Sequence, residues 1–262
     1  MSNENQTGEV VTWYTESPGV LVVMLDRPPA NALGMAILDG MHAAIDAAEQ
    51  AGDVKVMILA SALDGFFAAG ADIKHLSSID AESFLAYGDT MRAVNDRLAA
   101  APWISIAAVD GLALGGGLEL AMACTIRVSG PAGRYGLPEV KLGLIPGAGG
   151  TQRLPQLVGR GRALDIMLTA RQVRADEALR IGLVDRLTDG DVVEQALALA
   201  AELVTSSLPA QLAVVRSVDA AFELPLADGI AFEAKQEQGL FEDGEAAEGI
   251  RAFIDKRPPD FA

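Results

Sequence analysis

Cysteine and histidine are scarce in this chain of 262 residues, which holds one cysteine and two histidines. A single cysteine excludes an intramolecular disulfide and is compatible with a reducing compartment, so we expect a cytoplasmic location. Cys124 lies in an apolar run and is best interpreted as a small buried hydrophobic residue. Because one cysteine and two scattered histidines form no cluster of ligands, we predict no metal site.

Long apolar runs and an excess of basic residues are also absent. The longest apolar runs, such as GVLVVML, have the length of a strand, and the start MSNENQTG lacks the features of a signal peptide. Lysine and arginine total 20 against 36 aspartate and glutamate residues, a net charge of −16. A field of that sign repels nucleic acid and anionic membranes, so we expect neither as a partner. An anionic ligand must then be received locally, by a few cations or by backbone N–H groups.

Strand and helix patterns alternate along the first half of the chain. Apolar strand patterns cover 10–16, 19–28, 54–61 and 103–111. Helical spacing covers 35–52 and about 81–100, and a loop is expected at 62–76. This alternation implies right-handed βαβ crossovers and a largely parallel sheet.

The second half of the chain is different, because strand signals become few after 125–130 and 182–187. From Asp191 onward alanine, leucine and glutamate recur at helical spacing. We therefore predict an α/β core at 1–190 and a helical region at 191–262. These Ala- and Leu-rich helices exceed what one core can cover, which favours an oligomer.

The stretch from Gly111 to Cys124, GLALGGGLELAMAC, opens with four glycines in seven residues. It lacks the Gly-Lys-Ser/Thr of a Walker A loop and the glycine spacing of a dinucleotide fingerprint. What remains is a strand, a tight turn and a helix from about Gly117. The first N–H groups of a helix have no intrahelical partner and lie at its positive end, which favours a site for an anion or a reacting carbonyl oxygen. Close packing is the alternative, and it explains one glycine more easily than three in a row.

Two glutamates accompany this stretch. Glu119 falls two residues into the predicted helix, and Glu139 follows in YGLPEVKLGLIPGAGG. Capping alone could account for Glu119. Two carboxylates beside an oxyanion site, however, form an arrangement suited to acid–base work on an activated carbonyl compound, and their proximity tends to separate their pKa values.

Three segments together resemble the core motifs of the enoyl-CoA hydratase/isomerase (crotonase) superfamily: FFAAGADIKHL, AAVDGLALGGGLELAMAC and YGLPEVKLGLIPGAGGTQRLPQLVG. The resemblance implies an α/β fold, a crotonase-like spiral of repeated ββα units with a C-terminal helical trimerisation region. It also implies a homotrimer, or a homohexamer built as a dimer of trimers. The implied substrate is an acyl-CoA thioester, with no separate cofactor because coenzyme A is part of the substrate.

The resemblance also assigns roles by motif position. The N–H groups of Ala71 and Gly116 would polarise the thioester carbonyl, Glu119 would activate water as base, and Glu139 would deliver a proton to Cα. Gly147 matches a glycine whose backbone frames the water and the first glutamate. Having both glutamates favours reversible hydration of trans-2-enoyl-CoA to 3-hydroxyacyl-CoA. A double-bond isomerase, which would use Glu139 alone, or another acyl-CoA enzyme of this superfamily is the alternative.

Coenzyme A is an anion, so the acidic chain needs local contacts for it. The resemblance and the nearby motifs give as candidates Ala69, Ala71, Arg27, Lys74, Phe253 and Lys256. In the superfamily, contacts equivalent to those of Phe253 and Lys256 often come from a neighbouring subunit. Lys74, and Arg257 next to Lys256, are equally well explained as solvated surface charges.

Three further features bear on the comparison with the superfamily. Leu137 replaces a glutamine of some hydratases, and His75 replaces a frequent glutamate. His75 either lines the pocket or is an exposed helix residue without a special role, and we favour the second. Some hydratase-like proteins bind RNA through a lysine-rich helix, and this chain has no such run. The length of the acyl chain depends on the segment 77–90 and is left open.

Overall fold

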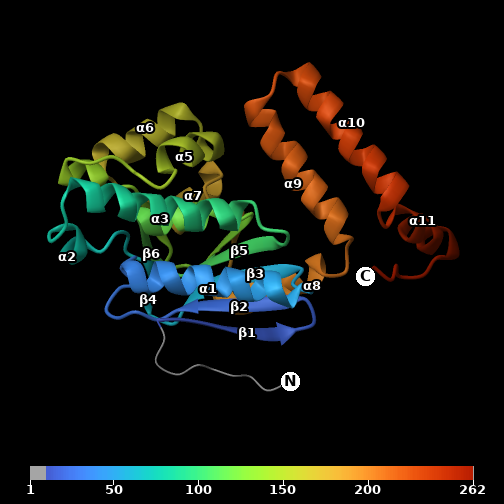
Figure 1. Ribbon diagram of the computed structural model, residues 1–262, viewed down its shortest axis with the longest axis horizontal. Coiled ribbons are helices and arrows are strands. Elements are labelled where there is room, and N and C mark those ends of the chain that lie inside the picture. Colours follow the sequence, from blue (N-terminus) through green and yellow to red (C-terminus); the bar gives the residue numbers. More distant parts are fainter. Residues whose placement is uncertain (1–9, 262) are drawn as a thin grey trace.

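Two β-sheets form the centre of the chain, which a computed structural model describes for residues 10–261 (Figure 1). The larger sheet has the order β1-β2-β3-β5-β7-β10. Its strands are β1 (Val11–Ser17), β2 (Val20–Leu25), β3 (Val56–Ser61), β5 (Ile104–Val109), β7 (Ile126–Ser129) and β10 (Arg186–Leu187). Neighbouring strands run parallel except β1 and β2, which are antiparallel. The predicted, largely parallel sheet is confirmed.

The smaller sheet, in the order β4-β6-β8-β9, is not predicted by the strand patterns. Its strands are β4 (Gly65–Ala68), β6 (Gly111–Leu114), β8 (Arg134–Gly136) and β9 (Val173–Arg174). The expected loop at 62–76 therefore contains a strand, and the expected turn after Gly111 contains another. Strands this short and rich in glycine are too brief for a recognisable period of two. Gly111 pairs with Gly65, and its φ of +133° together with the Gly65 carbonyl leaves no room for a Cβ.

The helices surround the sheets and extend beyond them. They are α1 (Met35–Ala51), α2 (Ile73–Leu76), α3 (Ala81–Ala99), α4 (Gly116–Ala123), the 3₁₀ helix η1 (Glu139–Leu142), α5 (Gly150–Val158), α6 (Arg160–Thr169), α7 (Ala175–Ile181), α8 (Val192–Leu203), α9 (Leu208–Glu223), α10 (Leu226–Asp243) and α11 (Ala246–Asp255). The order β1-β2-α1, β3-β4-α3 and β5-β6-α4 follows the ββα repeat that the resemblance implies.

Helices cover both faces of the larger sheet. Strand β5 is buried throughout and β3 nearly so, as expected for continuous apolar runs in a parallel sheet. Met57 and Leu59 join the core formed with α1 and α3, whereas Val56 and Ile58 join a second core formed with α8. Helix α8 thus packs on the sheet, although it lies within the predicted helical region at 191–262.

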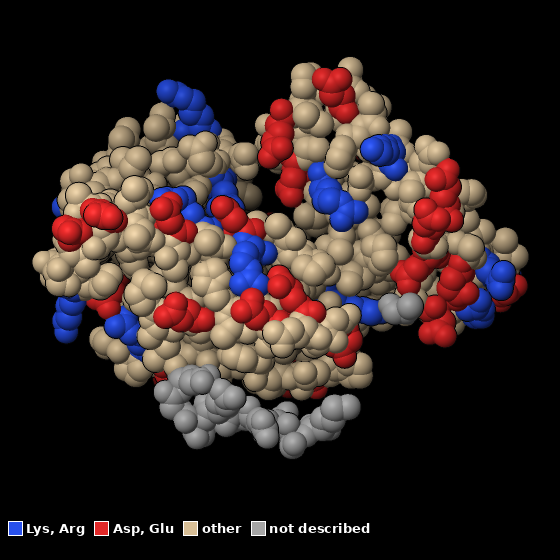
Figure 2. Space-filling view, in the orientation of Figure 1, with Lys and Arg blue, Asp and Glu red and all other residues tan. Residues whose placement is uncertain are grey.

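Helices α9, α10 and α11 form an arm beside the core (Figure 1). Helix α10 has no buried residue. Large apolar side chains exposed on the arm are Val214, Val218, Phe222, Leu226, Ile230, Phe241, Ile250, Phe253 and Ile254. This surface fits the predicted oligomer, whose state stays a prediction. Acidic side chains are spread over core and arm on the face in Figure 2, with basic ones between them.

Within residues 10–261, no single helix is long and apolar enough to cross a membrane. In the same range, one pair of helices, α8 and α9, has the required length and composition when taken together, and the pair is bent by 108°.

Candidate active site

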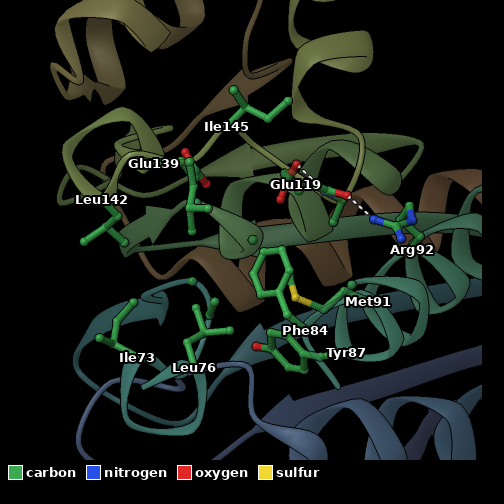
Figure 3. A pocket seen from close by; sticks show the side chains of 18 of the residues that line it. Ile73, Leu76, Phe84, Tyr87, Met91, Arg92, Glu119, Glu139, Leu142 and Ile145 are labelled. Carbon is green, nitrogen blue, oxygen red and sulfur yellow. Dashed lines mark hydrogen bonds between the residues drawn. The ribbon is translucent and has the colours of Figure 1, made fainter. Parts of the chain in front are cut away.

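A cavity of ≈ 180 Å³ opens between α2, α3, the start of α4, and the segment that follows Glu139 (Figure 3). It brings together six residues predicted from the sequence: Ala69, Ala71, Gly116, Glu119, Glu139 and Gly147. Its apolar wall consists of Ile73, Leu76, Phe84, Leu85, Leu142, Leu144 and Ile145. The lining therefore combines a few polar groups with many apolar side chains, as is usual for a small-molecule site.

Three consecutive glycines, Gly115 before α4 and Gly116 and Gly117 at its start, exclude a Cβ for three different reasons. At Gly115, where φ is +53°, a Cβ would lie 2.8 Å from Oε1 of Glu139. At Gly116 it would overlap the end of Met91, and at Gly117 the backbone carbonyl of Ala68. Close packing therefore explains Gly117, whereas Gly115 and Gly116 lie on the cavity itself.

Two backbone N–H groups meet beside these glycines. Gly116 is the first residue of α4, so its N–H has no intrahelical acceptor. Leu33 pairs in parallel with Ala71 and donates its own N–H to the Gly70 carbonyl over 2.8 Å. Along an extended segment, successive N–H groups point to opposite sides. The backbone groups of Gly70 and Asp72 face Leu33, so the N–H group of Ala71 between them points away from Leu33. A Cβ on Gly116 would lie 3.8 Å from the Ala71 nitrogen, so the two donors are neighbours.

Tyr87 of α3 fixes the segment that carries Ala71. Its hydroxyl donates to the Leu33 carbonyl and accepts from the Asp72 N–H over 3.3 Å. The Asp72 carboxylate also pairs with Arg27 at 2.7 Å. Desolvation raises the pKa of Tyr87, so the hydroxyl keeps its proton for donation. The donor beside the cavity is thus held by contacts on both sides.

Glu119 is 1% exposed and is held as an acceptor. Its Oε1 receives the N–H of Ala148 at 2.8 Å and the N–H of Gly150 at 2.7 Å. Burial raises the pKa of this carboxyl, while these two hydrogen bonds and the charges of Arg153 and Arg92 lower it. Burial is the larger influence, so the pKa of Glu119 lies above its ordinary value, and these four partners offset part of the desolvation of the ionised form.

Glu139 begins the 3₁₀ helix η1 and has a different environment. Its Oε2 is buried and has no hydrogen-bond partner within residues 10–261. Burial, followed by the charge of Glu119, raises the pKa of Glu139 to about 7. This carboxyl is therefore poised to hold a proton near neutral pH, beside a partner equipped to be an anion.

Gly147 lines the cavity, but it is not the residue that binds Glu119. Its carbonyl accepts from Arg92 at 2.8 Å, and the N–H groups on Glu119 belong to Ala148 and Gly150. Leu137 is fully buried, and a Cβ on Gly150 would lie 3.0 Å from its Cδ1. Leucine at position 137 thus supports the same segment by packing.

The structure does not bring four predicted residues to the cavity wall. Arg27 is engaged by Asp72 and donates to the Ala32 carbonyl at 2.6 Å, while Lys74 is exposed on α2. Phe253, 85% exposed, and Lys256 lie on and just after α11, at the opposite end of the view from α2 (Figure 1). Within one chain, these two do not reach the cavity.

The structure also shows the surroundings of His75 and Cys124, two residues discussed in the sequence analysis. His75 is half-buried and packs edge-on against the ring of Tyr87, with centroids 5.2 Å apart, and it does not line the cavity. Cys124 is buried, and desolvation raises the pKa of its thiol to about 12. The interpretation of Cys124 as a small buried residue is confirmed.

Sequence reasoning missed three residues of α3: Tyr87 and Arg92 line the cavity, and Asn95 donates to the carbonyl of Ala148 behind it. Met91, Val94 and Leu98 form the buried stripe of this helix, and Asn95 occupies a position within it. An amide in an apolar helical stripe is the signal that could have found Asn95, because a buried polar group requires a partner.

Comparison with known proteins identifies the family. The sequence model described as "Enoyl-CoA hydratase/isomerase" matches residues 15–262. The chain belongs to this family.

Relatives agree over nearly the full length of the chain. It is 40% identical to a "Probable enoyl-CoA hydratase" of Rhizobium meliloti, covering 95% of this chain and 97% of the relative. It is 35% identical to the mitochondrial methylglutaconyl-CoA hydratase of Mus musculus, covering 94% and 80%. The crystal structure of an enoyl-CoA hydratase from Bacillus anthracis matches with a TM-score of 0.92 at 31% identity, covering 97% of this chain and 99% of that one. The crotonase-type α/β fold with C-terminal helices is confirmed.

Proposed function

We propose that this protein is an enoyl-CoA hydratase, which adds water reversibly to a trans-2-enoyl-CoA thioester and forms 3-hydroxyacyl-CoA. The observation that carries the proposal is the pairing of Glu119 and Glu139 in one cavity, one surrounded by donors and cations and the other without a hydrogen bond at Oε2. A group that accepts a proton and a group that supplies one are what water addition requires.

In the proposed reaction, the thioester oxygen accepts hydrogen bonds from the N–H groups of Ala71 and Gly116. Ionised Glu119 removes a proton from water as the water oxygen bonds to Cβ. The electrons of the double bond move toward the carbonyl oxygen, where the two N–H groups stabilise the enolate charge. Protonated Glu139 then delivers its proton to Cα. The pair as a whole keeps one proton, so its transfer back from Glu119 to Glu139 completes the cycle.

The remaining parts of the proposal concern the coenzyme and the assembly. Phe253 and Lys256 would contact coenzyme A from a neighbouring subunit of a homotrimer or hexamer, since they lie away from the cavity of their own chain. Backbone groups of Ala69 and Ala71, with Lys74 at the rim, would contact it from the same chain. Arg27 would act indirectly, by holding Asp72. A cytoplasmic location and the absence of nucleic-acid and membrane partners belong to this proposal.

Glu119→Gln tests the reaction. Glutamine keeps the shape and an acceptor oxygen but removes the base, so hydration should fall by roughly 10²–10⁴ in kcat, the usual contribution of one positioned acid or base. The same variant, assayed for conversion of a 3-enoyl-CoA to a 2-enoyl-CoA, should keep most of any isomerase activity, which needs only Glu139.

Loss of the conjugated enoyl absorbance measures hydration across thioesters from short to long. Glu16→Gln, on the exposed end of the edge strand β1, is the matched control and should leave both rates unchanged. Near-normal hydration by Glu119→Gln would show that the reaction is not this one.

A further inference from the structure

One turn of α3 binds the backbone segment 147–150, and this segment in turn donates two hydrogen bonds to Glu119. The side chain of Asn95 is buried, with the residue 3% exposed, and its Nδ2 donates to the Ala148 carbonyl at 2.9 Å. Three residues earlier, Nη1 of Arg92 donates to the Gly147 carbonyl at 2.8 Å. Residues three apart on a helix share one face, so both contacts come from the same side of α3. Figure 3 shows Arg92 directed at this segment beside Glu119.

These contacts act on successive peptide groups. The peptide that joins Gly147 to Ala148 accepts from Arg92 through its oxygen and donates through its N–H to Glu119. The next peptide accepts through the Ala148 oxygen, from Asn95 at 2.9 Å and from Arg153 at 3.4 Å. The following peptide supplies the Gly150 N–H, the second donor to Glu119. Hydrogen bonds linked in this way orient and polarise one another.

We propose that Asn95, with Arg92, is a positioning residue for proton transfer, because it fixes the peptide groups that orient the carboxylate of Glu119. It touches neither the cavity nor the reacting atoms and acts through Ala148 alone. This inference rests on the proposed function, since it assigns Asn95 to the residue proposed as base.

Asn95 allows a cleaner test than Arg92. The charged groups that act on Glu119 are Arg92 on α3, Arg153 on α5 and Glu139 on η1. Replacing Arg92 would remove one of those charges together with the hydrogen bond. Asn95 is neutral, so its replacement leaves all three charges in place and changes only the hold on the peptide groups.

The expected result follows from the two N–H donors. They lower the pKa of Glu119 against the effect of burial. If the segment loosens, those bonds weaken and the pKa rises, so the base is protonated at a higher pH. A residue that only stabilises the fold would lower the melting temperature without moving this titration.

The experiment compares wild type with Asn95→Leu, which has a similar branched shape but no donor. Hydration is followed against pH for kcat and kcat/KM. We expect kcat about 10-fold lower, the rate equivalent of one buried hydrogen bond, with KM nearly unchanged. The acid limb of kcat/KM should move up by about one pH unit while the basic limb stays in place.

Ser105→Ala is the matched control, because Ser105 is equally buried but bonds to Thr125 on the sheet. It should lower the melting temperature and leave kcat and the pH limbs unchanged. Asn95→Ser disturbs the core less and replaces the leucine variant if that one does not fold.

An acid limb that stays at the wild-type pH in a folded Asn95 variant would overturn the positioning role, even if kcat falls. Failure of both variants to fold would also overturn it, because Asn95 would then serve the fold. If wild type hydrates no enoyl-CoA, short or long, the proposed function itself fails, which is a different result from either of these.

Discussion

The start of α4 and the turn that begins η1 each place one glutamate on the same cavity. The two carboxyl groups have different surroundings. Around Glu119 the chain gathers two N–H donors at 2.8 and 2.7 Å, with two guanidinium groups nearby. Around Glu139 it provides burial and a negative neighbour, and the buried Oε2 has no partner among the described residues.

This contrast teaches that residue type does not set the role of a carboxyl group. Desolvation raises the pKa of both glutamates, so burial alone would make both of them acids. The two N–H donors and two guanidinium groups around Glu119 offset part of that rise, whereas the charge of Glu119 adds to it at Glu139. The two roles therefore depend on the segments that surround the glutamates, the one near Gly150 for Glu119 and the one near Gly115 for Glu139.

A methyl group placed beside each carboxylate is the strongest way to break the contrast. In Gly150→Ala, the Cβ would lie 2.9 Å from Oε1 of Glu119 and 2.8 Å from Cβ of Pro146. We expect kcat for hydration to fall about 100-fold, since a displacement near 1 Å of a catalytic group costs about that much. The acid limb of the pH profile should move and the basic limb should not.

Gly115→Ala should give the complementary result. Its Cβ would lie 2.8 Å from Oε1 of Glu139, at a φ of +53° that disfavours alanine. Here the basic limb should move. Gly161→Ala is the control, because nothing lies within 4 Å of its Cβ on α6. Identical pH profiles for the Gly150 and Gly115 variants would contradict separate roles for the two segments.

The pH profile of wild type sharpens the contrast with a smaller effect. Hydration needs Glu139 protonated, and its pKa is raised to about 7. We expect kcat/KM to fall about 10-fold per pH unit above that value. Dehydration needs the proton on Glu119 instead, so the pair carries one proton in either direction and both reactions should show the same bell. A profile that stays flat to high pH would contradict an acid role for Glu139.

Stability gives the smallest effect, and we expect the larger change at Glu139. The Glu139 carboxyl has a pKa of about 7 when folded against an ordinary value of 4.5. Between these values the folded chain binds more protons than the unfolded one, so the free energy of unfolding falls as pH rises through this window and stays lowered above it. Glu139→Gln should therefore raise the melting temperature at pH 8 by about 2–5 °C, with a smaller gain at pH 5.

Glu119→Gln should gain less than Glu139→Gln at pH 8, because the loss of two charge-assisted hydrogen bonds from Ala148 and Gly150 offsets the relief from burying the charge. Thermal melts of both variants beside Glu16→Gln make the comparison. A Glu139→Gln variant that melts below wild type at pH 8 would show that ionised Glu139 is not a cost to the fold.

The larger sheet could be predicted because its central strands are apolar runs such as VMILAS, and their pattern is local. The smaller sheet could not, since β9 has two residues and β8 three. Their pairing is decided by neighbours far away in sequence, as Gly111 shows by lying against Gly65. The packing of α8 on the sheet was also invisible, because its apolar stripe does not say which surface it covers.

The candidate site divides in the same way. Glycines and glutamates near one another in sequence marked the cavity. The partners of Glu119 did not, because its N–H donors lie 29 and 31 residues away, and Asn95 lies 53 residues from Ala148. Contacts between residues so far apart in the chain produce no recognisable spacing in the sequence. Phe253 and Lys256 were named only through the resemblance, and a single chain gives them no contact with the cavity.

Helix α3 contacts the candidate site at two positions along its length. Phe84, Leu85 and Gly88 line the apolar wall, and Arg92 and Asn95 hold the segment behind Glu119 about two turns further on. If the proposed function holds, α3 is a poor place to change the range of acyl groups, because a shift of its first turns would also displace the residues that hold the segment behind Glu119. Ile73 and Leu76 belong to α2, a four-residue helix with no buried residue. Under the proposed function, substrate scope and turnover are thus linked on α3.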